Sequence, residues 1–397
     1  MLPGMWKNSA PSWGVVVLAT SLFVVTSSEF QVAAMLTAMS SDLGVSVADL
    51  GVLVTVYSLG MGFGGPILAW ALRRVNPRVA LVGVMLGYAV AEALAGAMAE
   101  QRSLVVLRLV AGALSGATFG MALTMGMHLG DEHNRAGASA GILTGLMAGT
   151  LLGLPLSHLI ATTLGWRASF YVLAAAAAAM ALAVAVVVPG APRVSDGSPI
   201  SFGALRNRDL WLRYVTSFLV IGGAFAAFAF VDPLLQRGGV AGSRATLTML
   251  GFGVAAFAVN HLTGRVAAGA ARPWLVVGVI VQLAALLIFL LAPATSSSIV
   301  IATMLLGGTG IALNPLLVNR VVAVAEPNVL VNTMHTSAIT LGVSAATMIG
   351  SRAIVGTGNL SGTVLVGVIF SAAAVVLVVS VRDGSPADDR RDRVTRL

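Results

Sequence analysis

Residues 189–209 read PGAPRVSDGSPISFGALRNRD, a stretch rich in proline, glycine, serine and charge. It lies between two long apolar regions of a chain whose 397 residues are 57% hydrophobic and only 10% charged. A soluble globular protein carries roughly 25% charged residues, so this composition indicates an integral membrane protein. The polar stretch is typical of a linker between two membrane-embedded halves.

Six apolar segments precede this linker and six follow it. A transmembrane helix needs roughly 20 mostly apolar residues, and breaks at charged or turn-forming residues delimit the segments. The expected spans are 13–38, 47–72, 79–99, 103–130, 136–163, 167–189, 210–235, 245–268, 273–292, 298–324, 328–354 and 360–381. We interpret the first as a span rather than a signal peptide, because it is too long and contains Glu29.

These segments predict an all-α integral membrane protein of twelve transmembrane helices in two six-helix bundles. The bundles are expected at 1–190 and 209–382, with a cytoplasmic linker at 191–208 and a disordered tail at 383–397. Basic residues are concentrated in one alternating set of loops and at the tail, whereas the other set contains only Arg102, Arg167, Arg237, Arg244 and Arg352. By the positive-inside rule, both termini are expected on the cytoplasmic side of the inner membrane.

The net charge of +8 is explained by this topology, so we expect no nucleic-acid partner. The chain has no cysteine, which excludes disulfides and thiolate metal ligands. No group of histidine and acidic residues has metal-binding spacing, and no phosphate-binding loop suggests the use of ATP. We therefore expect neither a metal nor a bound cofactor.

The loop between the second and third spans lies within GGPILAWALRRVNPRVAL, residues 64–81. This stretch resembles the signature loop of the major facilitator superfamily, in which glycine, an acid and basic residues form a gate latch. The acid that the resemblance leads one to expect is absent, because Ala71 and Leu72 stand before the arginines. A plain positive-inside loop is the alternative. The residues that would form the latch are Gly65, Arg73, Arg74 and Arg78.

The fourth and fifth spans carry two further resemblances to this superfamily. LVVLRLVAGALSGA, residues 104–117, places Arg108 four residues before Gly112 and resembles the motif of the fourth helix. The fifth span has glycines every four residues on one helix face, followed by a proline, and resembles the motif that distinguishes antiporters. Generic packing of small residues is the alternative. The candidate packing residues there are Gly145, Gly149, Gly153 and Pro155.

SEF at 28–30 and LGWRASFYVLA at 164–174 extend the resemblance to the drug and sugar efflux branch of the superfamily, which includes chloramphenicol-resistance, arabinose-efflux and purine-efflux exporters. The resemblance implies two six-helix halves repeated about an axis along the membrane normal. It also implies a monomer that moves a small molecule by alternating access, with the proton gradient as energy source. Gly145 and Gly153 in the fifth span have the same separation as Gly342 and Gly350 in the eleventh, as a repeat requires.

Buried charge is costly in a membrane, so each ionisable residue inside a span is a candidate for function. Glu29 lies about 13 Å below the outer end of its span, and Arg108 about 9 Å below the outer end of the fourth. In the resembled fold both helices line the central cavity, so the two side chains can form an ion pair there. Burial disfavours the ionised form of Glu29 and Arg108 favours it, which suits a proton carrier. A permanent structural ion pair is the alternative.

Three other ionisable residues need an interpretation. Asp232 is expected within about one turn of the outer end of the seventh span, where it serves proton coupling or gating, or is simply solvated by water. Glu92 lies on the third span, which is peripheral in the resembled fold. We expect it to be protonated, exposed to water or packed against a neighbouring helix, and we do not assign it to coupling. His335 lies among polar residues of the eleventh span, where it lines an inner vestibule or hydrogen-bonds two helices together.

The resemblance implies proton-coupled efflux of small, partly apolar compounds such as drugs. Methionine and phenylalanine among the candidate cargo-binding residues would accept varied apolar shapes and so give broad selectivity. The alternatives are an exporter of sugars or nucleobases, a lipid or lysolipid transporter, and a membrane enzyme. The enzyme is disfavoured because no nucleophile, base and orienting group recur near one depth. The candidate cargo-binding residues are Phe23, Ser28, Phe30, Gln31, Met121, Met125, Phe225, Phe228, Asn314 and His335.

Overall fold

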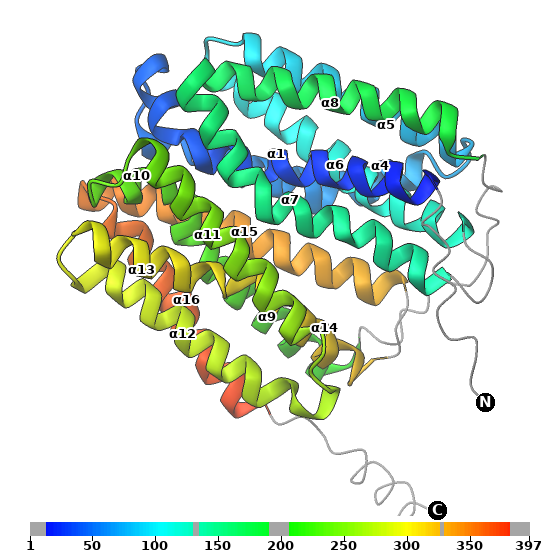
Figure 1. The fold of residues 1–397 in the computed structure, drawn as a ribbon. Coiled ribbons are helices and arrows are strands. Elements are labelled where there is room, and N and C mark those ends of the chain that lie inside the picture. The colour runs from blue at the N-terminus through cyan, green and yellow to red at the C-terminus, as the bar shows by residue number, and fades with distance from the viewer. Residues whose placement is uncertain (1–12, 130–134, 190–205, 326–328, 382–397) are drawn as a thin grey trace, which may run out of the picture. The chain divides into compact units, whose positions relative to one another are not determined.

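The computed structural model describes residues 13–129, 135–189, 206–325 and 329–381, and within these ranges the regular elements are all helical (Figure 1). Twelve of the described helical segments are long and apolar enough to cross a membrane. The predicted all-α fold and the predicted number of spans are therefore confirmed. Helices suit this environment because they satisfy every backbone polar group internally. The predicted disordered tail at 383–397 and most of the linker at 191–208 lie outside the described residues.

The first half of the chain forms six spans from eight α-helical pieces and one π-helical turn. They are α1 (Trp13–Leu43), α2 (Val47–Leu50), α3 (Val52–Leu59), the π-helix η1 (Gly60–Gly64), α4 (Gly65–Ala71), α5 (Pro77–Ala97), α6 (Gln101–Leu129), α7 (Arg135–Leu164) and α8 (Trp166–Val187). α1 is kinked at Met35, whose backbone has φ −138° and ψ 18°. The second span consists of α2, α3, η1 and α4, and its π-helical turn is rich in glycine.

The second half forms the other six spans, two of which are interrupted. Its elements are α9 (Arg208–Phe228), α10 (Val231–Arg237), α11 (Gly242–Thr263), η3 (Ala268–Ala270), α12 (Ala271–Leu291), α13 (Ser296–Gly307), η4 (Gly310–Leu313), α14 (Asn314–Val322), α15 (Val329–Thr357) and α16 (Ser361–Ser380). The predicted seventh span at 210–235 is thus two helices, α9 and α10. The tenth span breaks between α13 and α14, where Gly310 has a φ of 57° that favours glycine.

The described residues divide into two compact units, and the division does not fall only at the linker. Met39–Ser58, from the end of α1 through most of α3, belongs to the second unit. Within that unit the hydroxyl of Thr55 hydrogen-bonds that of Thr347 on α15 at 2.7 Å. Ser344 also donates to the carbonyl oxygen of Thr55 at 3.2 Å. The predicted bundles at 1–190 and 209–382 differ from the two units by this segment.

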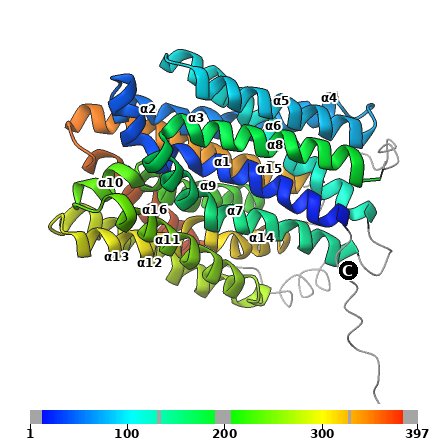
Figure 2. The same cartoon turned by 45° about the horizontal axis from the view of Figure 1, so that its top comes forward.

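In the first unit, the glycine face of α7 packs directly on α1, and the two helices lie side by side in Figure 2. A Cβ atom on Gly145 would lie 1.8 Å from the carbonyl oxygen of Ala19, and one on Gly153 would lie 2.7 Å from the Cα of Ser27. The predicted close approach of helices is therefore present here, with Gly149 between these two contacts and Pro155 following inside α7.

The second unit repeats this crossing between its corresponding helices. A Cβ atom on Gly342 of α15 would lie 2.3 Å from the carbonyl oxygen of Phe218 on α9. Backbones can approach this closely only where a side chain is missing. The fifth and eleventh spans thus meet the first and seventh spans in the same way, as a six-helix repeat requires.

The second span approaches α6 through glycines as well. A Cβ atom on Gly65 would lie 2.9 Å from the Cα of Gly116, and Gly112 is buried nearby on the same helix. The guanidinium of Arg73 lies over the ring of Trp70, 4.3 Å from its centroid. No described carboxylate forms an ion pair with the three predicted latch arginines, Arg73, Arg74 and Arg78.

Candidate functional site

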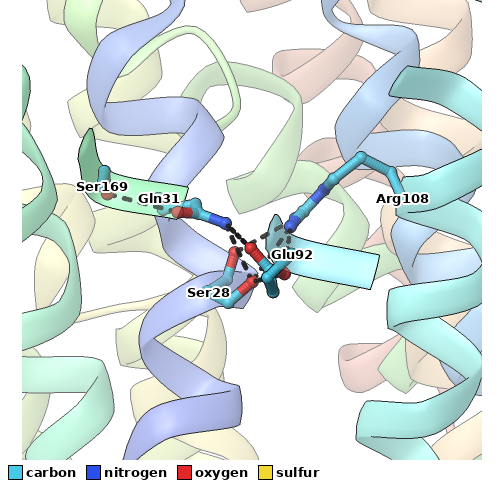
Figure 3. Close-up of polar contacts among 5 residues, drawn as sticks. All are labelled: Ser28, Gln31, Glu92, Arg108 and Ser169. Carbon is cyan, nitrogen blue, oxygen red and sulfur yellow. Dashed lines mark hydrogen bonds and ion pairs between the residues drawn. The ribbon is translucent and has the colours of Figure 1, made fainter. Parts of the chain in front are cut away.

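Five polar side chains from four helices of the first unit meet in one buried cluster (Figure 3). We call it the Glu92 cluster. Ser28 and Gln31 share a face of α1 because they are three residues apart. α5, α6 and α8 supply one residue each, so the cluster joins the first, third, fourth and sixth spans. Its members are Ser28, Gln31, Glu92, Arg108 and Ser169.

Arg108 makes three contacts in the Glu92 cluster. Its Nη1 lies 3.5 Å from Glu92 Oε1 and donates to the hydroxyl of Ser28 at 3.0 Å. Its Nη2 donates to the backbone carbonyl oxygen of Ser28 at 3.1 Å. The guanidinium is therefore hydrogen-bonded to the peptide group that immediately precedes Glu29. Such contacts offset the cost of burying a charge.

The carboxylate of Glu92 is the centre of the cluster. Its Oε1 accepts from the hydroxyl of Ser28 at 2.7 Å, and its Oε2 accepts from the amide of Gln31 at 2.8 Å. The oxygen of Gln31 in turn accepts from Ser169 of α8 at 3.2 Å. Only 1% of Glu92 is exposed, so of the expected alternatives the structure fits a side chain packed against its neighbours and not a water-exposed one. Both carboxylate oxygens of Glu92 therefore accept hydrogen bonds within the cluster.

Glu29 stands apart from this cluster although it follows Ser28 directly. It is partly exposed and forms no hydrogen bond or ion pair with a described residue. The predicted ion pair between Glu29 and Arg108 is therefore replaced by one between Arg108 and Glu92. Neighbouring residues of an α-helix point about 100° apart, so Ser28 and Glu29 cannot both face α5 and α6. Arg108 still interacts with Glu29 electrostatically.

The predicted cargo residues of the first unit fall into two groups. Ser28 and Gln31 are 0% exposed and hydrogen-bonded within the Glu92 cluster, so they cannot contact a cargo in this structure. Phe30 and Met125 are also buried. Phe23 on α1 and Met121 on α6 keep part of their surface exposed. Of this set, only the last two side chains are available to touch a ligand here.

The predicted aromatic residues of the second unit pack against each other. The rings of Phe225 and Phe228 lie 5.0 Å apart, and that of Phe228 lies 5.0 Å from Phe252 of α11. Both predicted residues are buried in this stack, which joins α9 to α11. Asn314 differs, because it is partly exposed at the start of α14 and its buried Oδ1 has no hydrogen-bond partner among the described residues.

Asp232 does not lie where the sequence placed it. The chain turns after α9, and Asp232 falls in the first turn of the separate helix α10. The residue is 2% exposed, and its Oδ1 accepts from the amide of Gln236 at 3.1 Å. The expected solvation by water is therefore wrong. A carboxylate in the first turn of a helix is instead favoured by the backbone dipoles there.

His335 lies between two helices of the second unit. Its Nε2 is 2.9 Å from the hydroxyl of Ser217 on α9, and its ring stacks on that of Tyr214 with the centroids 6.1 Å apart. Tyr214 donates to the carbonyl oxygen of Val331 at 2.9 Å, which adds a second link between the helices. With His335 5% exposed, this geometry fits the alternative in which it hydrogen-bonds helices together.

The twelve helices of membrane-spanning length define the class of a polytopic membrane protein. The sequence pattern of the Major Facilitator Superfamily matches residues 17–346, which is most of the chain. The protein belongs to this superfamily. Its family and its relatives are transporters rather than enzymes.

The chain is similar to several named proteins and to solved structures. The chain is 27% identical to the chloramphenicol resistance protein of Streptomyces lividans, over 94% of this chain and 98% of that protein. It is 22% identical to a probable sugar efflux transporter of Mannheimia succiniciproducens, over 95% of each chain. A bacterial homologue of the human lysosomal transporter Spinster, in an inward-facing and occupied conformation, has the same fold with a TM-score of 0.73 and 15% identity, covering 92% of this chain and 95% of that one.

Sequence reasoning did not identify two residues that lie at the centre of buried hydrogen-bond networks. Glu92 was set aside because its helix is peripheral in the resembled fold, although an acid in an apolar helix is itself a signal. Its partner Arg108 was found, but depth along the helices cannot show which of two acids faces it. The other missed residue is Gln282 of α12, which is 0% exposed in the second unit.

Proposed function

We propose that this protein is a proton-coupled exporter of small, partly apolar compounds such as drugs. It acts by alternating access in the cytoplasmic membrane and uses the proton gradient without a bound cofactor. The observation that carries this proposal is Glu29, an acid within a transmembrane helix that forms no hydrogen bond or ion pair with a described residue. A charge at such a position costs at least ~2.5–3.5 kcal/mol, so its presence favours a functional role.

The main rival role for Glu29 was a permanent ion pair that stabilises the helices. The Glu92 cluster already contains such a pair, formed by Glu92 and Arg108 without Glu29. Glu29 is therefore left to bind and release a proton next to a fixed positive charge. Nearby charge and changing hydration are the two factors that alter the proton affinity of a carboxylate. A change in the access of water during transport would therefore load or unload it.

The class of cargo follows from which side chains remain accessible. The polar candidates Ser28 and Gln31 are occupied by the Glu92 cluster, whereas the apolar Phe23 and Met121 retain exposed surface. This favours a partly apolar cargo, in agreement with the name of the chloramphenicol resistance protein to which the chain is similar. Asn314, whose carbonyl oxygen has no hydrogen-bond partner among the described residues, favours a second candidate, the export of sugars or nucleobases.

Everted membrane vesicles that contain the protein test the proposal. A pH gradient, acidic inside, is established, and a pH-sensitive dye records whether an added compound dissipates it. The panel contains chloramphenicol, arabinose, adenine and a lysophospholipid. We expect chloramphenicol or another partly apolar compound to dissipate the gradient with wild-type protein and not with Glu29→Gln.

Other results of this experiment have defined meanings. A response to arabinose or adenine alone identifies the second candidate. A response to the lysophospholipid alone identifies a lipid transporter. If an added compound is transported but the gradient is unaffected, the protein is not proton-coupled.

A further inference from the structure

In the second unit, the side chain of Gln282 hydrogen-bonds to three other spans, and these spans correspond to those that the Glu92 cluster joins in the first unit. We call this set of hydrogen bonds around Gln282 a tie, and use the same word for the Glu92 cluster. Gln282 of α12 donates from its amide to the carbonyl oxygen of Val220 on α9 at 3.0 Å and to the hydroxyl of Ser371 on α16 at 2.9 Å. Its oxygen accepts from the backbone N–H of Gly310, in the break of the tenth span, at 3.1 Å. Gln282 therefore joins the seventh, ninth, tenth and twelfth spans.

Each of these spans has its counterpart in the Glu92 cluster. α12 is the third span of its half, as α5 is of the first half, and both place the central side chain. A serine on the last span closes each tie, Ser169 in the first unit and Ser371 in the second. The matching glycine crossings of Gly145 and Gly342 support the same correspondence between the halves.

The two ties differ in charge. A neutral amide joins four spans in the second unit, whereas the first unit uses a carboxylate and a guanidinium for the same connections. A buried ion pair gives no dependable gain in stability over neutral groups of similar size. The architecture therefore does not require the charges of Glu92 and Arg108, and their presence calls for another explanation.

Resting on the proposed function of Glu29, we infer that Glu92 is a positioning residue that neutralises Arg108 and so lets Glu29 bind a proton. Arg108 donates a hydrogen bond to the peptide group before Glu29. An arginine without a counter-ion at that place would hold Glu29 in its ionised form. With the carboxylate of Glu92 3.5 Å from it, the guanidinium has a weaker net effect on Glu29. Glu92 thus determines the pH range in which Glu29 exchanges its proton.

The surrounding helices carry further titratable groups. On α5 itself, Tyr88 is 0% exposed and lies one turn before Glu92. α8 carries Arg167, whose guanidinium lies over the ring of Trp166, and Tyr171, which packs against Gly96 about one turn beyond Glu92. α7 carries His158 more than one turn beyond its contact with Ser27. α6 carries Arg102 at its exposed beginning.

The test is a titration of the purified full-length protein in lipid nanodiscs, followed by infrared spectroscopy with isotope-labelled glutamate. The measured quantity is the pH at the midpoint of the protonated carboxyl signal. This readout needs no cargo. We expect a titrating signal that disappears in Glu29→Gln and whose midpoint falls by about one pH unit or more in Glu92→Gln, a tenfold or greater loss of proton affinity.

Two further variants keep the test decisive. Glu92→Asp shortens the side chain by one methylene and weakens its contact with Arg108, so it should shift the midpoint in the same direction by a smaller amount. It replaces Glu92→Gln if that variant does not fold. Gln282→Asn shortens the neutral tie of the second unit and should leave the midpoint unchanged, whatever it does to stability.

The possible outcomes distinguish a failure of the inferred role of Glu92 from a failure of the proposed role of Glu29. A midpoint that stays at the wild-type value in both Glu92 variants overturns the inference while leaving Glu29 as the proton carrier. A signal that disappears in Glu92→Gln and persists in Glu29→Gln also overturns it, because Glu92 itself then titrates. A signal that persists in both Glu29→Gln and Glu92→Gln refutes Glu29 as the proton carrier.

Discussion

The guanidinium of Arg108 lies 3.5 Å from the carboxylate of Glu92, and both side chains are 1% exposed. Removing the positive partner alone, as in Arg108→Gln, leaves a buried carboxylate without a counter-ion. We expect this variant to lose about 3–5 kcal/mol of stability. The double variant Glu92→Gln/Arg108→Gln should recover most of the loss, because an amide forms the same connections in the second unit. Thermal unfolding in detergent measures both, and equal melting temperatures of the single variant and the wild type would contradict the pairing.

The hydrogen bonds of Gln282 in the second unit should not tolerate the replacement of its amide by a carboxylate. Gln282→Glu places a carboxylate against the carbonyl oxygen of Val220, where the amide now donates a hydrogen bond. Within the described structure no arginine takes the place that Arg108 has beside Glu92. We expect a large drop in folded yield, because a buried carboxylate here must stay protonated or remain unpaired. Yield by size-exclusion chromatography, compared with the double variant Glu92→Gln/Arg108→Gln, measures the asymmetry, and equal tolerance of the two changes would argue against it.

The crossing of α7 on α1 gives a third prediction. Gly145→Ala introduces a Cβ atom 1.8 Å from the carbonyl oxygen of Ala19, so the helices must move apart. Overpacking of this kind costs about 1–3 kcal/mol. The control is Gly83→Ala on α5, where a Cβ atom meets nothing within 4 Å. Melting temperatures should fall for the first variant and hold or rise for the second, and a stable Gly145→Ala would show that the helices are not in close contact.

The interface between α9 and α15 gives a fourth prediction. His335→Phe removes the hydrogen bond to Ser217, whose hydroxyl keeps its bond to the carbonyl oxygen of Arg213 at 3.1 Å. The loss of one hydrogen bond should therefore cost about 0.5–1.5 kcal/mol. Because His335 lies between helices, transport per folded molecule should change less than twofold. Thr336→Ser, at the exposed neighbouring position, is the control for both measurements. A variant with wild-type stability and lost transport would instead place His335 in the cargo path.

Sequence reasoning predicted the architecture well because hydropathy determines which segments enter a bilayer. Twelve spans and the glycine face of α7 could be inferred from composition and spacing alone. The breaks after Phe228 and Gly307 were missed, because the apolar character of each span continues through the break. Such interruptions depend on tertiary partners, such as the amide of Gln282 that binds the backbone of Gly310.

The candidate site was predicted only in part for a similar reason. Arg108 was identified because an arginine inside a helix is expensive. The choice between Glu29 and Glu92 as its partner depends on the rotation of α1 and α5 about their own axes. The position of a residue along its helix, which the sequence gives, does not determine how the helix is rotated about its axis and therefore which neighbour the side chain faces. Ser28 is the residue whose direction decides it, since its hydroxyl contacts both charged groups.

The central claim is that Glu29 carries the proton, and its most direct test is proton release by the purified protein. A compound that dissipates the gradient in the vesicle experiment is added to detergent-solubilised protein in weakly buffered solution, and a pH dye records the released protons. Glu100→Gln, at an exposed position between α5 and α6, is the control and should release protons as the wild type does. We predict release by the wild type and none by Glu29→Gln at saturating compound. Undiminished release by Glu29→Gln would contradict the claim.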